Sequence, residues 1–198
     1  MKGKLFILSG PSGVGKNTIL NRILEQRRNV RYSVSATSRR MRPGEIDGKS
    51  YYFVSRERFE EMIRQDELLE YAEYVGNYYG TPLAPIREAL DHGVDVVMDV
   101  EVVGARKIRA RMPEAVLVFV TVSSMETIRR RLISRGDVSE EVMQKRLTQA
   151  KWECAQAAES YDYVILNDDL ENAVSEFNAV MTAEKCKLTE RIRLLKEE

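Results

Sequence analysis

The sequence predicts an α/β fold in which a parallel sheet is flanked by helices and carries an inserted small mixed-β subdomain. Three observations predict this fold. A short apolar strand pattern ends in a glycine-rich turn and is followed by helical periodicity. After Pro82, strand and helix patterns alternate at lengths typical of parallel βαβ units. Between residues 35 and 81, by contrast, several short β segments follow one another.

The first half of the chain begins with an apolar run over residues 4–9, which ends at Gly10 and is typical of a buried parallel strand. The helix expected next has apolar side chains on one face, namely Ile19, Leu20, Ile23 and Leu24. Further strands are expected at residues 31–35, 50–55, 68–75 and 78–81. We expect a polar, arginine-rich loop over 36–48, and Ser55 can cap a helix over 56–65.

The second half of the chain alternates helices with strands. Helices are expected at residues 84–92 and 104–112, after Ser123 through residue 134, at about 139–160, and from about 170 onward. Strands are expected at residues 94–100, 115–122 and 163–166. Gly93 and Pro113 end the first two helices, and Ser123 with Glu126 has the spacing of a capping box for the third.

The composition excludes several classes of function. The 198 residues carry 31 basic and 31 acidic side chains, and this zero net charge argues against sequence-independent nucleic-acid binding. His92 is the only histidine, which excludes mechanisms that need two, including those of most zinc hydrolases. Cys154 and Cys186 show neither zinc-knuckle nor disulfide-framework spacing. Because no run is long and apolar enough for a signal peptide or a membrane span, we expect a cytoplasmic protein without a membrane partner.

The strongest motif is a glycine-rich loop between the first strand and the first helix. It fits the pattern G-x-x-x-x-G-K and consists of Gly10, Pro11, Ser12, Gly13, Val14, Gly15 and Lys16. Its glycines let backbone N–H groups approach a ligand, and the helix N-terminus adds positive charge to this anion site. Lys16 contributes a mobile positive charge. The loop therefore predicts a binding site for nucleotide phosphates.

Two further residues bear on a metal ion. Where the general motif offers a serine or threonine hydroxyl to Mg²⁺, this chain has Asn17, followed by Thr18. The amide oxygen of Asn17 can coordinate a hard cation directly or through water. Asp99 ends an apolar strand, like the acid that helps to hold Mg²⁺ in enzymes that bind nucleotides through a loop of this kind. We expect Mg²⁺ as the cofactor, and Asn17 and Asp99 as its candidate ligands.

A second group of motifs indicates the acceptor. Residues 35–55 contain Ser35-Ala-Thr-Ser-Arg39-Arg-Met-Arg42-Pro-Gly-Glu and, a little later, Gly-Lys-Ser-Tyr51. This segment resembles the pattern S-x-T-T-R-x-x-R-x-G-E and G-K-x-Y-x-F of the guanylate kinase family, from which it departs at Ser38. The resemblance continues in order through Glu70, the turn at 76–81, Asp99, Glu101, Arg131, Arg135, Arg146 and Asn167. It implies a P-loop nucleoside monophosphate kinase fold with a helical lid.

The resemblance also implies the reaction ATP + GMP → ADP + GDP, an in-line phosphoryl transfer in purine nucleotide metabolism and GMP recycling. ATP and GMP are then the expected small-molecule partners. The resemblance places GMP on Ser35, Arg39, Arg42, Tyr51, Glu70, Tyr79, Thr81, Asp99 and Glu101. It places ATP on the loop from Gly10 to Thr18 and on Asn167. It gives catalytic roles to Lys16, Arg39, Arg42, Arg131, Arg135 and Arg146.

The chemistry of the predicted acceptor residues suits GMP. Arg39 and Arg42 supply two guanidinium forks in one loop, and tyrosine hydroxyls beside them suit a phosphate monoester. A carboxylate such as Glu70 can accept hydrogen bonds from both N1–H and the exocyclic NH₂ of guanine, a donor pair that adenine lacks. The attacking phosphate oxygen of GMP is already anionic near neutral pH, so the reaction needs no general base.

We expect one domain over residues 1–198 with three parts. The core comprises residues 1–34, 82–123 and 161–198, the GMP-binding subdomain comprises 35–81, and the lid comprises about 124–160. Two alternatives to the kinase activity stay open. One is a non-catalytic guanylate-kinase-like interaction domain, and the other is a related P-loop kinase that acts on a phosphorylated sugar. Either a monomer or a homodimer is compatible with the sequence.

Overall fold

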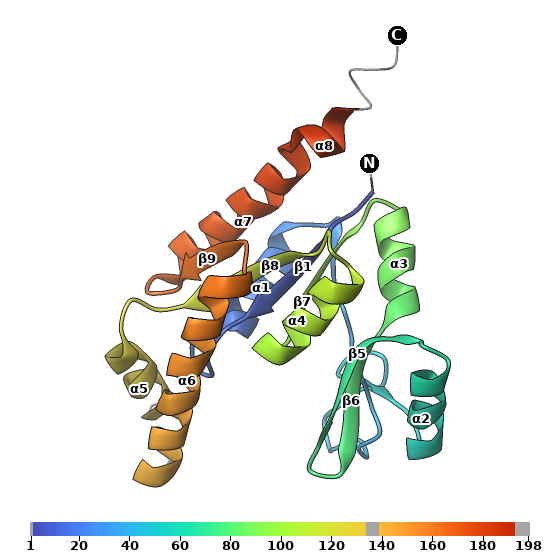
Figure 1. Cartoon of the computed structure of the whole chain (residues 1–198), viewed down its shortest axis with the longest axis horizontal. Coiled ribbons are helices and arrows are strands. Elements are labelled where there is room, and N and C mark those ends of the chain that lie inside the picture. Colours follow the sequence, from blue (N-terminus) through green and yellow to red (C-terminus); the bar gives the residue numbers. More distant parts are fainter. Residues whose placement is uncertain (1, 134–138, 193–198) are drawn as a thin grey trace.

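A computed structural model describes residues 2–133 and 139–192 of the chain. Its centre is a five-stranded sheet, beside which stands a smaller four-stranded sheet (Figure 1). The main sheet has the strand order β2-β7-β1-β8-β9. The bounds of these strands are Leu5–Ser9 (β1), Val30–Tyr32 (β2), Asp95–Asp99 (β7), Val116–Thr121 (β8) and Tyr163–Leu166 (β9). All of their pairings are parallel, so the predicted α/β fold with a parallel sheet is confirmed.

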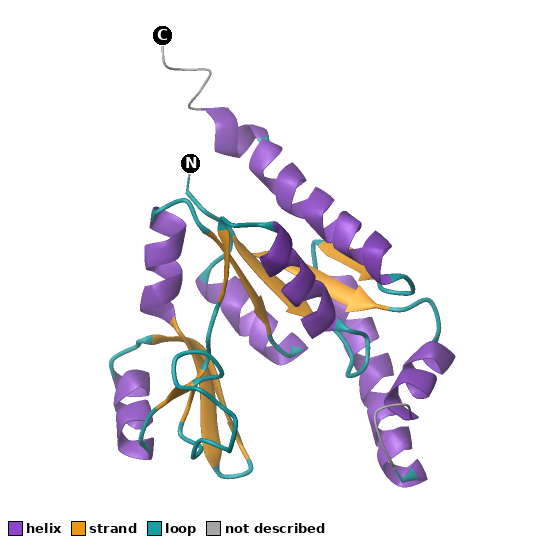
Figure 2. Ribbon diagram, turned by 180° about the vertical axis from the view of Figure 1, so that it is seen from behind, coloured by secondary structure: helices purple, strands orange, loops and turns teal. Residues whose placement is uncertain are grey.

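Helices cover both faces of the main sheet (Figure 2). These helices are α1 (Lys16–Gln26), α3 (Leu83–Asp91), α4 (Val102–Arg111) and α7 (Leu170–Cys186). Strand residues alternate between the two faces, so Phe6 and Leu8 of β1 pack against α1 and α7, whereas Leu5 and Ile7 pack against α3 and α4. All four side chains are at most 2% exposed. The core therefore has two layers, one on each face of the main sheet.

The smaller sheet has the strand order β4-β3-β6-β5. Its strands and covering helix are β3 (Ala36–Thr37), β4 (Tyr52–Phe53), β5 (Leu68–Tyr74), β6 (Asn77–Pro82) and α2 (Arg56–Arg64). β3 runs parallel to β4 and antiparallel to β6, and β5 forms an antiparallel hairpin with β6. Phe59 and Met62 of α2 are buried against Leu68, which gives this sheet a core of its own. The expected second, mixed-β region is therefore present.

β3 lies in a segment that the sequence predicts to be loop. Residues 36–48 are polar and arginine-rich, yet Ala36 and Thr37 pair with both β4 and β6. Two residues are too few to show the alternation on which strand prediction depends. The strand expected at 31–35 is also shorter than predicted, because β2 ends at Tyr32 and the chain then crosses to the smaller sheet.

Two helices extend from the main sheet on the side away from β5 and β6 (Figure 1). They are α5 (Met125–Ile133) and α6 (Glu140–Ser160). The predicted capping box of α5 is wrong by one residue, because the hydroxyl of Ser124 accepts the hydrogen bond from the backbone of Thr127. Ser123 instead donates its backbone N–H to the carboxylate of Asp168. Across residues 2–133 and 139–192, the helices lack the combined length and apolarity that a membrane crossing requires.

Ion pairs fasten the C-terminal helices to the N-terminal strand. A short helix, α8 (Leu188–Arg191), follows α7. Lys4 Nζ lies 2.8 Å from Glu190 Oε1 and 3.8 Å from Glu184 Oε2. The Tyr163 hydroxyl donates to Glu184 at 2.6 Å, and that carboxylate is 2% exposed. These contacts lie at the amino end of β1, so they leave the carboxyl ends of the strands open for a site.

Candidate active site

The glycine-rich loop joins the carboxyl end of β1 to α1. A Cβ atom at Gly10 would lie 2.0 Å from the carbonyl oxygen of Val120 on β8. Gly15 has a φ of 90°, and a Cβ atom there would lie 2.5 Å from Asn167 Nδ2. Both positions therefore require glycine. Because α1 begins at Lys16, the positive end of its dipole lies at this loop, as an anion site requires.

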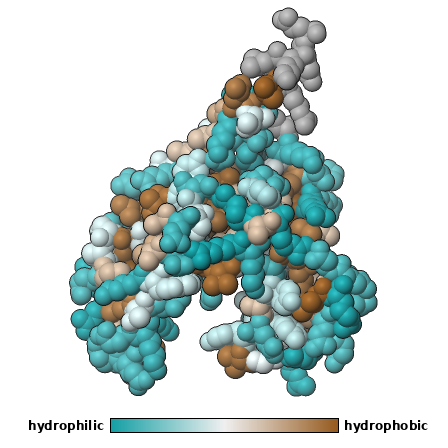
Figure 3. All heavy atoms as spheres, viewed as in Figure 1, coloured by the Kyte–Doolittle hydropathy of each residue, from teal (hydrophilic) through white to brown (hydrophobic). Residues whose placement is uncertain are grey.

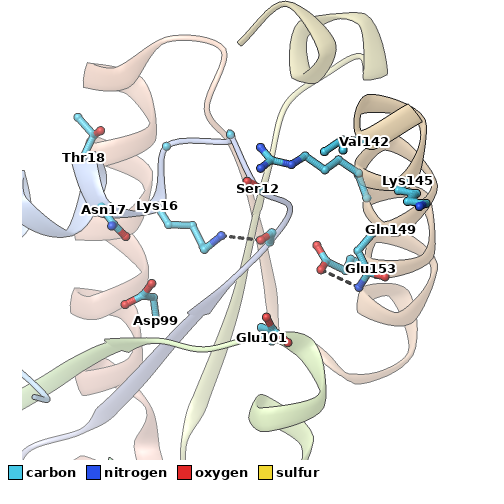
Figure 4. Close-up of a pocket in the computed structure, with 15 residues that line it drawn as sticks. Ser12, Lys16, Asn17, Thr18, Asp99, Glu101, Val142, Lys145, Gln149 and Glu153 are labelled. Atoms are coloured by element: carbon cyan, nitrogen blue, oxygen red, sulfur yellow. Dashed lines mark hydrogen bonds between the residues drawn. The ribbon is translucent and has the colours of Figure 1, made fainter. Parts of the chain in front are cut away.

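A cavity of about 720 Å³ opens beside the glycine-rich loop (Figure 4). We call it the donor cavity. From the loop and α1 it is lined by Gly10, Ser12, Gly13, Gly15, Lys16, Asn17 and Thr18. From β7 and the segment after it, Asp99 and Glu101 contribute carboxylates, and α6 contributes Arg146, Gln149 and Glu153. Most of the predicted nucleotide loop thus faces one cavity, whereas Pro11 and Val14 are not part of its lining.

Lys16 folds back over the loop. Its Nζ donates to the carbonyl oxygen of Gly10 at 2.5 Å and to that of Pro11 at 3.3 Å. Figure 4 shows the Lys16 side chain extending into the donor cavity, with Asn17 and Asp99 near the end of the side chain that joins α1. The cavity therefore presents an ammonium group together with backbone N–H groups and a helix N-terminus, a combination that suits a chain of phosphates.

Asn167 and Arg131 support the loop from behind. Asn167 is 5% exposed, and its Nδ2 donates to the carbonyl oxygen of Val14 at 2.6 Å. The guanidinium of Arg131, on α5, donates to the carbonyl oxygen of Asn167 at 2.7 Å and to that of Val14 at 3.4 Å. Both predicted site residues thus contact the backbone of the loop or the residue that holds it. The adenine-side contact expected of Asn167 stays a prediction.

A second cavity of about 550 Å³, which we call the acceptor cavity, lies between the main sheet and the smaller one. Its lining includes the predicted acceptor residues Ser35, Tyr51, Glu70 and Tyr79. Four residues line both cavities, namely Gly10, Lys16, Asp99 and Glu101. The two cavities therefore meet at the carboxyl ends of β1 and β7, where open parallel sheets bind ligands. Figure 3 shows the wider hollow between the two projecting parts of the molecule.

Glu70 is the acid that the smaller sheet contributes to the acceptor cavity. Its Oε1 accepts a hydrogen bond of 2.8 Å from the hydroxyl of Thr81, which is fully buried. Its Oε2 lies near α4, since a Cβ atom at Gly104 would be 3.6 Å from it. Burial raises the pKa of Glu70 above that of an ordinary glutamate, and the Thr81 hydrogen bond opposes this only in part. The hydrogen bond from Thr81 therefore fixes one carboxylate oxygen, and the other oxygen lies toward Gly104 of α4.

Arg39 is held by a neighbouring acid. Its two terminal nitrogens donate to Glu45 Oε1 at 2.6 Å and Oε2 at 3.0 Å, and the backbone N–H of Arg42 donates to Oε2 at 2.7 Å. The Arg39 guanidinium lies 5.6 Å from the ring centre of Tyr51, which packs edge-on against Tyr79. The hydrogen bonds from Arg39 hold the pKa of Glu45 below its ordinary value. The predicted phosphate residues Arg39, Tyr51 and Tyr79 are thus brought together, while Arg42 is exposed beside them.

Comparison with known proteins identifies the family. The model of the family described as guanylate kinase matches residues 2–184. The guanylate kinases of Halalkalibacterium halodurans and Thermus thermophilus are 50% and 51% identical to this chain over 186 and 185 residues. The alignments cover 94% and 93% of this chain, and 91% and 83% of those proteins. The chain belongs to the guanylate kinase family.

The structure of a guanylate kinase agrees with this membership. The crystal structure of guanylate kinase from Anaplasma phagocytophilum matches all of this chain and 95% of its own, with a TM-score of 0.77 and 36% sequence identity. The family that the motifs predict is therefore confirmed. So is the predicted fold class, because the same arrangement of a parallel sheet, flanking helices and a second mixed sheet is found in a guanylate kinase.

Asp99 lies where the two cavities of this guanylate kinase family member meet. The hydroxyl of Tyr32 donates to Asp99 Oδ1 at 2.5 Å. Burial and the adjacent Asp99 carboxylate raise the pKa of Tyr32 well above that of an ordinary tyrosine, so its hydroxyl stays a donor. Asn17 and Glu101 line the donor cavity together with Asp99. These three side chains thus offer the cavity oxygen ligands from two carboxylates and one amide.

These oxygen ligands fit Mg²⁺ that is bound jointly with a nucleotide. In the part of the chain that the structure describes, no group of three or more His, Cys, Asp or Glu side chains is arranged to hold a metal ion. Mg²⁺ takes oxygen ligands and is usually bound by one or two carboxylates together with substrate phosphates rather than by a cage of protein side chains. Asp99 and Asn17 beside the phosphate loop match that kind of site.

Glu45, Tyr32 and Glu153 are not among the predicted site residues, although each lines a cavity or contacts a residue of the site. Glu45 belongs to the same motif as Arg39 and Arg42. Its position three residues after Arg42 is the signal that its carboxylate can accept hydrogen bonds from this motif. Tyr32 shows no signal in the sequence. Glu153 of α6 lines the donor cavity, is 9% exposed and has its pKa raised by burial. Of the predicted residues, Arg135 lies outside the described ranges.

Proposed function

We propose that this chain transfers a phosphoryl group from ATP in the donor cavity to GMP in the acceptor cavity. The overall reaction is ATP + GMP → ADP + GDP, in keeping with membership of the guanylate kinase family and with about 50% identity to curated guanylate kinases. The observation that supports this division most strongly is that Gly10, Lys16, Asp99 and Glu101 line both cavities. A phosphoryl group can then pass directly from the donor cavity to the acceptor cavity.

The donor side binds through the loop from Gly10 to Thr18. Backbone N–H groups and the start of α1 bind the phosphates of ATP, and Lys16 exchanges its carbonyl contacts for phosphate oxygens. Asn167 and Arg131 hold the loop in shape through the carbonyl oxygen of Val14. Because the loop is fixed before ATP binds, little reorganisation is needed when negative charge develops on the transferred group.

Asn17 and Asp99 are the residues that would hold Mg²⁺. When bound, the ion neutralises charge on the β- and γ-phosphates. Asp99 contributes a carboxylate oxygen and Asn17 an amide oxygen, directly or through water. Glu101 lines both cavities, as Asp99 does, and we assign it to the acceptor side because the family resemblance places GMP there.

The acceptor side combines a phosphate clamp with a base reader. Arg39, Arg42, Tyr51 and Tyr79 supply forked and hydroxyl donors to the phosphate of GMP. Glu70 accepts from N1–H and the exocyclic NH₂ of guanine through its two oxygens, and Thr81 orients this carboxylate by donating to Oε1. Ser35 and Glu101 complete this side of the cavity. AMP lacks this pair of hydrogen-bond donors, so the half-buried carboxylate of Glu70 would lose hydrogen bonds if AMP took the place of GMP.

The chemistry needs positioning and charge more than proton transfer. The nucleophile is an anionic phosphate oxygen of GMP, so no side chain has to remove a proton from it. This agrees with the place of His92, which ends α3, contacts the carbonyl oxygen of Glu88 at 2.7 Å and lines neither cavity. Lys16, Arg39 and Arg146 instead offset the repulsion between two polyanions.

The three-part organisation accounts for exclusion of water. We take residues 1–34, 82–123 and 161–198 as the core, 35–81 as the GMP-binding subdomain, and about 124–160 as the lid. Arg131 and Arg146 lie on the lid helices α5 and α6, and Arg146 faces the donor cavity. Closure of both parts over bound ATP and GMP would bring Arg146 to the phosphates, beside the loop that Arg131 already contacts, and would keep water from the transferred group. A cytoplasmic role in purine nucleotide metabolism and GMP recycling completes the proposal.

A panel of acceptors tests this function. Formation of ADP from ATP is followed with GMP, AMP, UMP and sugar phosphates in a coupled assay. We expect rapid turnover with GMP and turnover at least about 100-fold slower with the others, given the unpaired carboxylate that they would leave. Equal rates with AMP would contradict the assignment of Glu70. A sugar phosphate that outcompetes GMP, or no turnover with any acceptor, would support one of the two alternatives named above.

A further inference from the structure

Tyr32 contacts a residue of the site without lining either cavity. We infer that Tyr32 is a positioning residue for Asp99, whose carboxylate it orients toward the bound cation at the junction of the two cavities. This inference rests on the part assigned to Asp99 in the proposed function. Its evidence is the 2.5 Å hydrogen bond from the Tyr32 hydroxyl to Asp99 Oδ1, between strands that are 67 residues apart in the sequence.

The sheet register places the two side chains together. β2 pairs with β7 in parallel, with Tyr32 opposite Val97. Residues that pair across strands share a face of the sheet, and so do residues two apart along one strand. Tyr32 and Asp99 therefore project from the same face as Val97, which packs in the core layer of α1. Because α1 begins at Lys16, this is the face on which the phosphate loop and Asn17 lie.

The hydrogen bond determines what Asp99 can offer. A carboxylate at the end of a strand can rotate about its last bond, and each rotation presents a different oxygen to the cavity. The donated hydrogen bond occupies Oδ1 and so leaves Oδ2 for the cation. Groups that hydrogen-bond to the metal-binding carboxylates of proteins orient them in this way, and their loss typically weakens metal binding about 10- to 100-fold.

The position of Tyr32 also links the cation to the acceptor side. Tyr32 is the last residue of β2, and the backbone N–H of Ser33 still donates to Val97 at 2.9 Å. The chain then leaves the main sheet and enters β3 at Ala36. The contact with Asp99 thus lies where the segment that carries Arg39 leaves the main sheet.

Removal of the hydroxyl alone is a clean test. The Tyr32 side chain is 39% exposed and a phenylalanine ring fits the same space, so Tyr32→Phe should keep the fold. Binding of a non-hydrolysable ATP analogue is measured by calorimetry, once with Mg²⁺ and once with a chelator. We expect Tyr32→Phe to weaken binding about 10-fold with Mg²⁺ and to leave binding in chelator unchanged. The matched control is Tyr74→Phe at the exposed hairpin tip, which should behave like the native protein in both solutions.

A second variant separates failure of this inference from failure of the proposed function. Asp99→Asn should also weaken binding only with Mg²⁺, and the double variant should lose little more than Asp99→Asn alone, because the two residues act through one contact. If Asp99→Asn weakens Mg²⁺-dependent binding and Tyr32→Phe does not, the inference is wrong and the proposed function stands. If Asp99→Asn itself has no such effect, the part assigned to Asp99 is wrong. Additive losses in the double variant, or weaker binding of Tyr32→Phe in chelator, would also overturn the inference.

Discussion

The donor and acceptor cavities adjoin each other but are built by different means. The donor cavity is shaped by the backbone of a loop whose course is set by close approaches at Gly10 and Gly15. The acceptor cavity is lined by side chains from the smaller sheet and from α4, and the predicted base- and phosphate-binding groups on this side of the molecule already have protein partners. Glu70 accepts from Thr81, and Arg39 forms a forked pair with Glu45.

This difference separates two tasks. Backbone N–H groups recognise phosphate, which all nucleotides share, and they need no particular side chain to do so. Side-chain carboxylates and guanidinium groups recognise a base and a monoester, and each substitution changes what they accept. We therefore expect changes in the donor cavity to affect turnover with any acceptor, and changes in the acceptor cavity to affect the choice and affinity of the acceptor.

The largest expected effect is on the donor side. Lys16→Ala removes the ammonium group at the centre of the loop and should lower kcat by about 100- to 1000-fold, as loss of a charge-stabilising group does in other enzymes. Its melting temperature should stay close to that of the native protein, because Lys16 is only partly buried and lines the cavity rather than the hydrophobic core. Lys151→Ala, on the exposed side of α6, is the matched control. A Lys16→Ala variant with nearly native kcat would refute the donor assignment.

The next effect concerns the base. Glu70→Gln replaces one acceptor oxygen by a donor that faces the donors of guanine, so the dissociation constant of GMP should rise about 10- to 100-fold, equivalent to about 1–3 kcal/mol. Binding of the ATP analogue should not change. Calorimetry with each nucleotide measures both, and Glu73→Gln on the exposed end of the same strand is the control. Equal weakening of both nucleotides would mean that Glu70 supports the fold rather than reads guanine.

The fold itself should tolerate that substitution. Burial raises the pKa of Glu70, so the carboxyl group of Glu70 holds its proton more tightly in the folded state than in the unfolded chain. The ionised carboxylate therefore lowers stability at neutral pH, and removal of its charge should not lower the melting temperature. A clear fall in melting temperature would assign Glu70 a structural task instead.

A smaller effect is expected at the phosphate clamp. Arg39→Lys keeps the charge but loses the planar fork, and it should raise the KM for GMP about 10-fold while the KM for ATP stays unchanged. Arg40→Lys is the control, because Arg40 is exposed and offers Arg39 only its backbone carbonyl oxygen among the contacts described. Steady-state kinetics with each substrate varied in turn measures the two constants. A rise in the KM for ATP of equal size would contradict the separation of the two cavities.

The smallest effect is a dependence on pH. Guanine needs the ionised form of Glu70, so affinity for GMP should fall as the pH falls through the raised pKa of this carboxyl group. The fall should begin at a higher pH than an ordinary glutamate, with a pKa of about 4.3, would give. The phosphate of GMP also titrates, near pH 6. The ratio of the native affinity to that of Glu70→Gln removes this contribution, and a ratio independent of pH would contradict the prediction.

The phosphate loop could be predicted residue by residue, whereas contacts between segments that lie far apart in the sequence could not. The loop is a run of consecutive residues, so its motif and its place between a strand and a helix are visible in the sequence. The contact of Tyr32 with Asp99 depends on β2 lying next to β7, and hydrophobic periodicity does not give strand order. Glu153 is hidden in the same way, because only the packing of α6 brings it to the donor cavity.

A compound that joins adenosine to guanosine through a chain of phosphates tests the central claim most directly, namely that the two cavities act as one site. Its inhibition is measured against varied ATP and, separately, against varied GMP. We predict competitive inhibition in both experiments, with tighter binding than either nucleotide alone, because one molecule would span the edge lined by Lys16 and Asp99. Competition with only one of the two substrates would show that the cavities do not exchange a phosphoryl group.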